Sequence, residues 1–297
     1  METDVHRAVD WSAGVESTVR SVGDVRLHVV AAGDEDDPLV VLLHGFPEFW
    51  YGWRSQIDPL VDAGFRVLVP DQRGYNLSEK PESIRAFRTR ELSRDVANLI
   101  ATEGRDAAHV VGHDWGGAVA WDLALRRPEA VDTLAIVNAP HPAVHRQLLA
   151  SDPEQLLRSW YVFFFQLPVL PELLCRADDF RFLERGMRGL ANPRIFGDEE
   201  LARYRRSWHR EGALTAMLNW YRAAARYPPD LPRNRVDAPT LVVWGEDDRA
   251  LVPAQAVGAR QHCPNGRLEM LPGVSHWVQH EVPERLSGLL LEHLDAS

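Results

Sequence analysis

The residue whose setting most clearly predicts chemistry in this sequence is Asp114. It stands in Gly112-His113-Asp114-Trp115-Gly116-Gly117, between an apolar stretch at 109–111 and a helix-forming stretch that Pro128 ends. Glycines two positions before and after Asp114 would let a strand and a helix approach without a Cβ clash. This spacing is that of a nucleophile elbow, with aspartate where serine usually stands. The motif predicts a nucleophile pushed out of a sheet on a sharp strand-to-helix turn.

Two further polar residues follow predicted strands and would complete a catalytic set with Asp114. Asp248 comes after an apolar stretch at 240–244, and His276 comes after a stretch at 267–271. Side chains at the carboxyl ends of parallel strands meet at one edge of a sheet, where ligands bind. A lone carboxylate there is more often a helix cap, and a lone histidine is more often a loop residue. The order nucleophile, acid, histidine favours a catalytic role for all three together.

Aspartate in place of serine changes the reaction that the set predicts. A serine alkylated at an sp³ carbon becomes an ether, which water does not cleave, whereas an alkylated aspartate is an ester. Asp114 is therefore predicted to attack a carbon that bears a leaving group, and His276, oriented by Asp248, then activates water. The backbone N–H groups of Phe46 and Trp115 are the predicted oxyanion donors.

Strands that alternate with helices must position these residues. Amphipathic helices are predicted at 89–101 and from about 283 to 294. Alternation of this kind predicts a mostly parallel sheet covered on both faces. The strand patterns fall at 15–22, 25–31, 39–43, 66–69, 109–111, 133–137, 240–244 and 267–271.

The alternation is interrupted once. No strand pattern occurs between 141 and 231, a stretch rich in arginine, leucine and aromatic residues and broken by prolines. We therefore expect a helical cap over residues 141–231, between a first core segment at 1–140 and a second at 232–297.

These motifs together resemble the α/β-hydrolase-fold epoxide hydrolases of the soluble epoxide hydrolase type, over nearly the whole chain. His44-Gly45-Phe46-Pro47 is similar to their oxyanion loop, in which the Phe46–Pro47 bond is expected to be cis. The 113–117 and 273–277 segments resemble their nucleophile and histidine motifs, and Asp248 falls where their charge-relay acid does. The resemblance implies the α/β-hydrolase fold, with a mostly parallel eight-stranded sheet and a helical cap inserted after strand 6.

The resemblance also assigns a role to two tyrosines of the expected cap. Tyr161 and Tyr221 occupy the positions of the family's two cap tyrosines, which hydrogen-bond the epoxide oxygen. A phenol with a pKa near 10 is neutral at pH 7 and can protonate the alkoxide that leaves when an epoxide opens to a vicinal diol. The expected substrate pocket comprises His44, Pro47, His113, Trp115, Phe165 and Trp277.

Two other functions stay open at this point. Haloalkane dehalogenases of the same fold resemble the chain at Asp114-Trp115, but they typically have asparagine where Phe46 stands. Fluoroacetate dehalogenases typically have arginine after the nucleophile, where this chain has Trp115. A non-catalytic ligand-binding homologue is the third possibility, since fold alone does not define function.

Composition limits the partners. The net charge of −10 argues against nucleic acid, which selects a basic surface. No apolar stretch is long enough to span a membrane, and no leader-type segment follows the acidic start, which predicts a cytoplasmic protein. No metal or nucleotide motif is present, so no cofactor is expected. The expected partners are a small-molecule epoxide and water, with the chain a monomer or homodimer.

Overall fold

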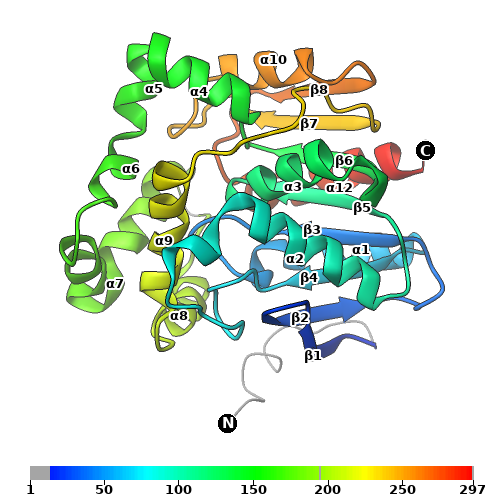
Figure 1. Cartoon of the computed structure of the whole chain (residues 1–297), viewed down its shortest axis with the longest axis horizontal. Coiled ribbons are helices and arrows are strands. Elements are labelled where there is room, and N and C mark those ends of the chain that lie inside the picture. Colours follow the sequence, from blue (N-terminus) through cyan, green and yellow to red (C-terminus); the bar gives the residue numbers. More distant parts are fainter. Residues whose placement is uncertain (1–13, 194, 296–297) are drawn as a thin grey trace.

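One sheet of eight strands runs through the computed structural model, which describes residues 14–193 and 195–295 (Figure 1). The predicted strands are confirmed within these residues. Residues 1–13 and 296–297, the two ends of the predicted core, lie outside the described residues. The acidic start of the chain, on which the predicted location rests, lies within 1–13. The strands are β1 (Glu16–Ser21), β2 (Arg26–Ala32), β3 (Leu39–Leu43), β4 (Arg66–Pro70), β5 (Ala108–His113), β6 (Val131–Val137), β7 (Thr240–Gly245) and β8 (Gly266–Leu271).

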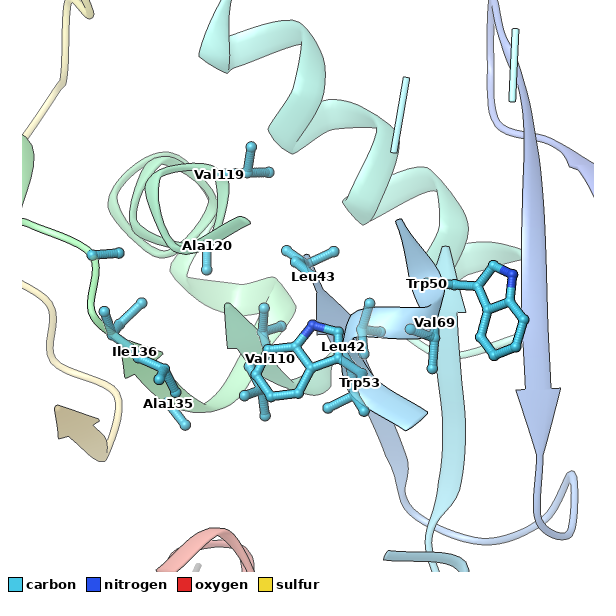
Figure 2. Packing of buried hydrophobic residues seen from close by; sticks show 14 of the residues in the cluster. Leu42, Leu43, Trp50, Trp53, Val69, Val110, Val119, Ala120, Ala135 and Ile136 are labelled. Carbon is cyan, nitrogen blue, oxygen red and sulfur yellow. The ribbon is translucent and has the colours of Figure 1, made fainter. Parts of the chain in front are cut away.

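The strand order is β1-β2-β4-β3-β5-β6-β7-β8. β2 pairs antiparallel with β1 and β4, and the other neighbouring pairs are parallel. The central strands are buried on both faces, as their continuous apolar sequences require. Figure 2 shows side chains of this core, with Leu42 and Val110 of the sheet, Val119 of the following helix and the indole of Trp53.

Helices cover both faces of the sheet. α2 and α3 pack together on one face, and α1 and α12 pack together on the other (Figure 1). The predicted helices at 89–101 and 283–294 are confirmed as α2 and α12, but α1 and α10 were not predicted. The helices of the core are α1 (Arg54–Asp62), α2 (Thr89–Thr102), α3 (Trp115–Arg126), α10 (Ala254–Gln261), α11 (Val278–Glu281) and α12 (Pro283–Leu294), with the short 3₁₀ turns η2 (Trp50–Trp53), η3 (Ile84–Phe87) and η4 (Pro128–Ala130).

Within the described residues, every regular element between β6 and β7 is a helix. Figure 1 shows these helices beyond the carboxyl ends of the parallel strands. Residues 177–180 leave helical geometry, so α7 is broken into two pieces. Within the described residues, no helix has the length and apolar character needed to cross a bilayer. The segment contains α4 (Pro142–Ser151), α5 (Pro153–Arg158), α6 (Trp160–Phe164), α7 (Leu170–Leu190), α8 (Asp198–Trp208) and α9 (Ala213–Arg226).

The close approach of α3 to the sheet depends on glycine. A Cβ added to Gly116 would lie 2.1 Å from the carbonyl oxygen of Leu43, which belongs to the central strand β3. Neither backbone can move far, because both are buried in the core.

Replacing Gly116 by alanine is therefore expected to lower the free energy of unfolding by about 1–3 kcal/mol or more, as overpacking does. Gly288→Ala in α12 is the matched control, because its added Cβ meets no atom within 4 Å. That change should raise stability by up to about 1 kcal/mol through helix propensity. Urea unfolding of the two variants measures the contrast. Equal stabilities would show that α3 and β3 are not in tight contact.

Candidate active site

Asp114 lies on a strained turn between β5 and α3. Its backbone has φ 50° and ψ −119°, in the left-handed region that residues other than glycine rarely adopt. The backbone N–H of Phe46, after β3, donates to Asp114 Oδ1 at 2.8 Å. The Phe46–Pro47 bond is cis. Trp115 is the first residue of α3, where a backbone N–H has no acceptor within the helix.

Three residues from the ends of different strands meet beside this turn. His276 Nε2 lies 3.7 Å from Asp114 Oδ2, and His276 Nδ1 lies 2.7 Å from Asp248 Oδ2. The other carboxyl oxygen of Asp248 accepts the backbone N–H groups of Ala250 and Leu251 at 2.7 and 3.0 Å. Asp248 and His276 are almost fully buried. The structure therefore brings the three predicted residues into the order carboxylate, imidazole, carboxylate.

Electrostatics favour the charged form of His276. Burial alone would lower its pKa, but the negative charges of Asp248 and Asp114 and the hydrogen bond to Asp248 outweigh burial and raise the pKa to about 9. Burial likewise opposes ionisation of Asp248, yet the charge and hydrogen bond of His276 hold the Asp248 pKa below its ordinary value. At pH 7 the ring is therefore mostly an imidazolium.

This arrangement predicts the effect of removing that charge. Asp114→Asn keeps an oxygen for the Phe46 N–H but deletes the negative charge 3.7 Å from His276 Nε2. The pKa of His276 should fall below about 9, as an NMR titration of its ring would show. Asp247→Asn, an exposed carboxylate of the same loop, is the control and should leave the titration in place. An unchanged pKa in Asp114→Asn would mean that Asp114 does not act on the ring.

The two predicted tyrosines lie close together on two helices of the segment between β6 and β7. Tyr161 comes from α6 and Tyr221 from α9, and their ring centroids are 5.9 Å apart. Tyr221 packs edge-on against Phe46 and Trp115, at 5.1 and 5.0 Å between centroids. Burial, followed by the charge of Asp114, raises the pKa of Tyr161 well above its ordinary value, and the pKa of Tyr221 is raised by burial and by its neighbour Tyr161. Both phenols therefore keep their protons at neutral pH.

A cavity of about 340 Å³ adjoins both tyrosines and Asp114. Asp114, His276, Tyr161 and Tyr221 all line it. Of the residues expected in the substrate pocket, the cavity is lined by Pro47, Phe165 and Trp277, together with the oxyanion-loop residue Phe46.

Three expected pocket residues require correction. His44 does not reach the cavity, because its ring is fully buried between the carbonyl of Gly45 and the backbone N–H of Gln72, at 3.0 and 3.1 Å. His113 is also fully buried and lies 2.9 Å from the carbonyl oxygen of His276. The indole of Trp115 is not part of the cavity wall and packs behind Tyr221. These three residues support the walls.

Two residues that were not predicted from the sequence hold the site together. Asn138, directly after β6, donates to Asp248 Oδ2 at 2.6 Å and accepts the N–H of Gly245 at 2.9 Å. The sequence context of Asn138, a polar residue directly after a strand, could have identified it, because the same context identified Asp248 and His276.

A second missed residue, Glu48, is buried behind the site. It accepts hydrogen bonds from Tyr204 of α8 at 2.8 Å and from Gln279 of α11 at 3.0 Å, and it lies 2.7 Å from His280. Although burial opposes ionisation, the charge of His280 and hydrogen bonds hold the Glu48 pKa well below its ordinary value. Glu48 thus joins the cap to the core.

No group of three or more His, Cys, Asp or Glu side chains is placed to hold a metal ion within the described residues.

Comparison with known proteins agrees with this geometry. A family described as alpha/beta hydrolase fold matches residues 38–283. The AB hydrolase superfamily protein YfhM of Bacillus subtilis is 47% identical over 95% of this chain and 98% of its own length. Epoxide hydrolase 1 of Caenorhabditis elegans is 39% identical over 92% of this chain and 69% of its own. The crystal structure of epoxide hydrolase A from Mycobacterium thermoresistibile matches with a TM-score of 0.85 and 32% identity, over 95% of this chain and 98% of that one. The chain belongs to the α/β-hydrolase fold family, among its epoxide hydrolases.

Proposed function

We propose that this protein hydrolyses epoxides to vicinal diols through an ester formed on Asp114. The observation that carries the proposal is that a carboxylate and two phenols line the same cavity. A carboxylate attacks a strained carbon directly, and a phenol supplies the proton that an alkoxide leaving group needs.

In the first step, Asp114 Oδ2 attacks an epoxide carbon. A C–O bond forms to Oδ2 as the epoxide C–O bond breaks, and the departing oxygen takes a proton from Tyr161 or Tyr221. Oδ1, which accepts the Phe46 N–H at 2.8 Å, becomes the ester carbonyl oxygen. No base is needed, because the nucleophile is already an anion.

Formation of the ester prepares the second step electrostatically. Asp114 loses its charge on alkylation, so one of the two carboxylates that raise the pKa of His276 disappears. The His276 pKa falls, so the imidazolium gives up its proton, which replaces the one that the tyrosine donated to the epoxide oxygen. The neutral ring can then accept a proton from water. The resulting hydroxide attacks the ester carbonyl carbon. The Phe46 and Trp115 backbone N–H groups stabilise the oxyanion that forms on Oδ1. Collapse of this intermediate breaks the bond between the carboxyl carbon and the diol oxygen, which takes the proton from His276. The proton of the Asp114 carboxyl then returns to His276, so the diol leaves and the carboxylate and imidazolium are restored.

Dehalogenation is the rival reaction of the same nucleophile. A halide leaves as a stable anion and needs no proton, so it gives no reason for two buried phenols that keep their protons. The test is to incubate the purified protein with styrene oxide and with haloalkanes and haloacids, and to measure diol and free halide side by side. Diol alone is expected, and Asp114→Ala should abolish it. Halide release without diol would reject the proposal.

Three further expectations belong to this proposal. Residues 141–231 act as the cap and residues 1–140 and 232–297 as the catalytic core. The protein works in the cytoplasm on a small-molecule epoxide and water, as a monomer or homodimer.

A further inference from the structure

Tyr161 and Tyr221 come from two helices that are held in different ways. α9, which carries Tyr221, is buried at 217–223, and its Trp220 donates to the carbonyl oxygen of Arg73 in the core at 3.0 Å. No residue of the short helix α6, which carries Tyr161, is buried. Burial alone therefore fixes the position of Tyr221 but not that of Tyr161.

In the part of the chain that the structure describes, the ring contacts of Tyr161 stay within the segment between β6 and β7. Its ring meets those of Trp160 and Phe165, with centroids 6.3 and 6.0 Å away, and that of Tyr221. The first two belong to α6 and to the residue directly after it. The position of Tyr161 relative to Tyr221 therefore depends on what joins α6 to α9.

Arg222, the residue after Tyr221, joins α9 to the end of α6. Its side chain is almost fully buried. Nε donates to the carbonyl oxygen of Phe165 and Nη2 donates to that of Leu167, both at 3.0 Å. The carbonyl groups at the end of a helix have no donor within the helix, and a positive charge beside them is favourable. Arg222 therefore caps α6 from a neighbouring helix.

The same guanidinium binds the chain beyond the turn that follows α6. Nη1 and Nη2 donate to the two carboxyl oxygens of Glu172, in the first turn of α7, at 2.7 and 3.0 Å. Nη1 also lies 3.3 Å from Asn219 Oδ1, so the five N–H donors of Arg222 have five acceptors. A lysine has three donors and no planar fork, so it cannot replace this set.

The turn between these two sets of bonds is strained. Val169, a β-branched residue, has φ 64° and ψ −45°, and an N–H to carbonyl hydrogen bond of 2.6 Å closes the turn around it. This is a classic γ-turn, a rare conformation that persists where its surroundings fix it. Arg222 holds the chain before the turn at Leu167 and after it at Glu172. Without these bonds the turn can relax and the end of α6 can move.

We propose that Arg222 is a positioning residue, which holds Tyr161 beside Tyr221 so that both phenols reach one epoxide oxygen. The inference rests on the proposed function and adds a residue to it. Arg222 does not line the cavity, so it acts through Tyr161. Gln166 adds one further bond between the two helices, to the carbonyl oxygen of Tyr221 at 3.2 Å. Loss of the Arg222 bonds should therefore displace α6 without detaching it.

The test begins with the rate at which excess enzyme consumes styrene oxide, which reports the alkylation of Asp114. Arg222→Lys keeps a positive charge beside Glu172 but loses the fork that also reaches the carbonyl groups. We expect consumption to slow by about 10-fold, the effect of losing one phenol. Arg205→Lys is the matched control, because Arg205 of α8 pairs with two carboxylates of α7, and it should keep the wild-type rate.

The two tyrosine variants separate positioning from a general loss of stability. In Tyr161→Phe, adding Arg222→Lys should slow consumption by less than about 2-fold, because the phenol that Arg222 positions is already absent. In Tyr221→Phe, the same addition should leave almost no activity, because it displaces the one remaining phenol. Equal effects of Arg222→Lys in the two backgrounds would overturn the inference, as would a wild-type rate in Arg222→Lys alone.

Hydrogen exchange tests the role of Arg222 without relying on the reaction. In Arg222→Lys the backbone amides of residues 161–167 should exchange faster than in the wild type, and in Arg205→Lys they should be unchanged. Unchanged exchange in Arg222→Lys would reject the inference. If the wild type consumed no styrene oxide, the proposed function would fail instead, and the exchange rates would still decide whether Arg222 holds α6.

Discussion

Replacing His276 by glutamine is expected to stop turnover after one epoxide per active site. Asp114 can still attack, because an ionised carboxylate needs no general base. The ester then persists, because no imidazole lies beside it to activate water. We expect the steady-state rate to fall by about 10²- to 10⁴-fold, the usual contribution of a general base.

Intact-protein mass spectrometry measures this outcome directly. The His276→Gln protein should gain the mass of one epoxide, and peptide mapping should place it on Asp114. His209→Gln, which changes an exposed histidine of the cap, should turn over normally and accumulate no adduct. An unmodified His276→Gln protein that still made no diol would show that His276 is needed before the ester forms.

Removing both phenol donors is expected to abolish epoxide opening. Each of Tyr161→Phe and Tyr221→Phe deletes one hydrogen bond to the developing alkoxide, so each should slow alkylation by about 10-fold or more. The double variant has no proton donor at the epoxide and should show almost no activity. Tyr227→Phe, a cap tyrosine that is 41% exposed, is the control.

A second substrate separates proton donation from a structural role of the tyrosines. An alkyl sulfonate leaves as a stable anion without a proton, so any slow alkylation of Asp114 by such a compound should survive the double substitution. Loss of both reactions would indicate a collapsed cavity. Epoxide opening at the wild-type rate in the double variant would assign the proton to another group.

The sequence predicted the sheet well because its central strands are continuous apolar runs. β3 and α12 have the expected ends, whereas β6 begins two residues early, where Val131 pairs with Ala108 beside an irregularity in the register. The helix α1 was missed because Pro59 stands inside it, and α10 has eight residues, too few for a clear amphipathic period.

The site was predictable to the extent that its residues follow strands. Strand ends and chain order identified Asp114, Asp248 and His276, whose side chains the sheet brings together. The resemblance, and not strand ends, placed His44 and His113 in the pocket. A histidine after a strand has the same sequence context whether its ring faces a cavity or the core. Only the tertiary hydrogen bonds of these rings distinguish the two cases.

Residues that depend on contacts between the cap and the core carried no local signal. Glu48 directly follows the oxyanion-loop sequence at 44–47, but its partners on α8 and α11 are more than 150 positions away. Arg185 and Arg249 likewise reach one cavity from segments 64 positions apart, as their numbers show. Contacts of this kind depend on how the cap and the core pack together, and the spacing of residues along the sequence does not predict them.

Isotope labelling of a single turnover tests the covalent mechanism most directly. Unlabelled enzyme in excess over epoxide, in water enriched in oxygen-18, should release diol that carries mainly unlabelled oxygen at the attacked carbon, because that oxygen comes from the Asp114 carboxylate. Hydrolysis of the ester leaves label in the carboxylate, so later turnovers should deliver oxygen-18 to the diol. Label in the diol from the first turnover would contradict the account, because it would mean that water attacks the epoxide directly while Asp114 serves only as a base.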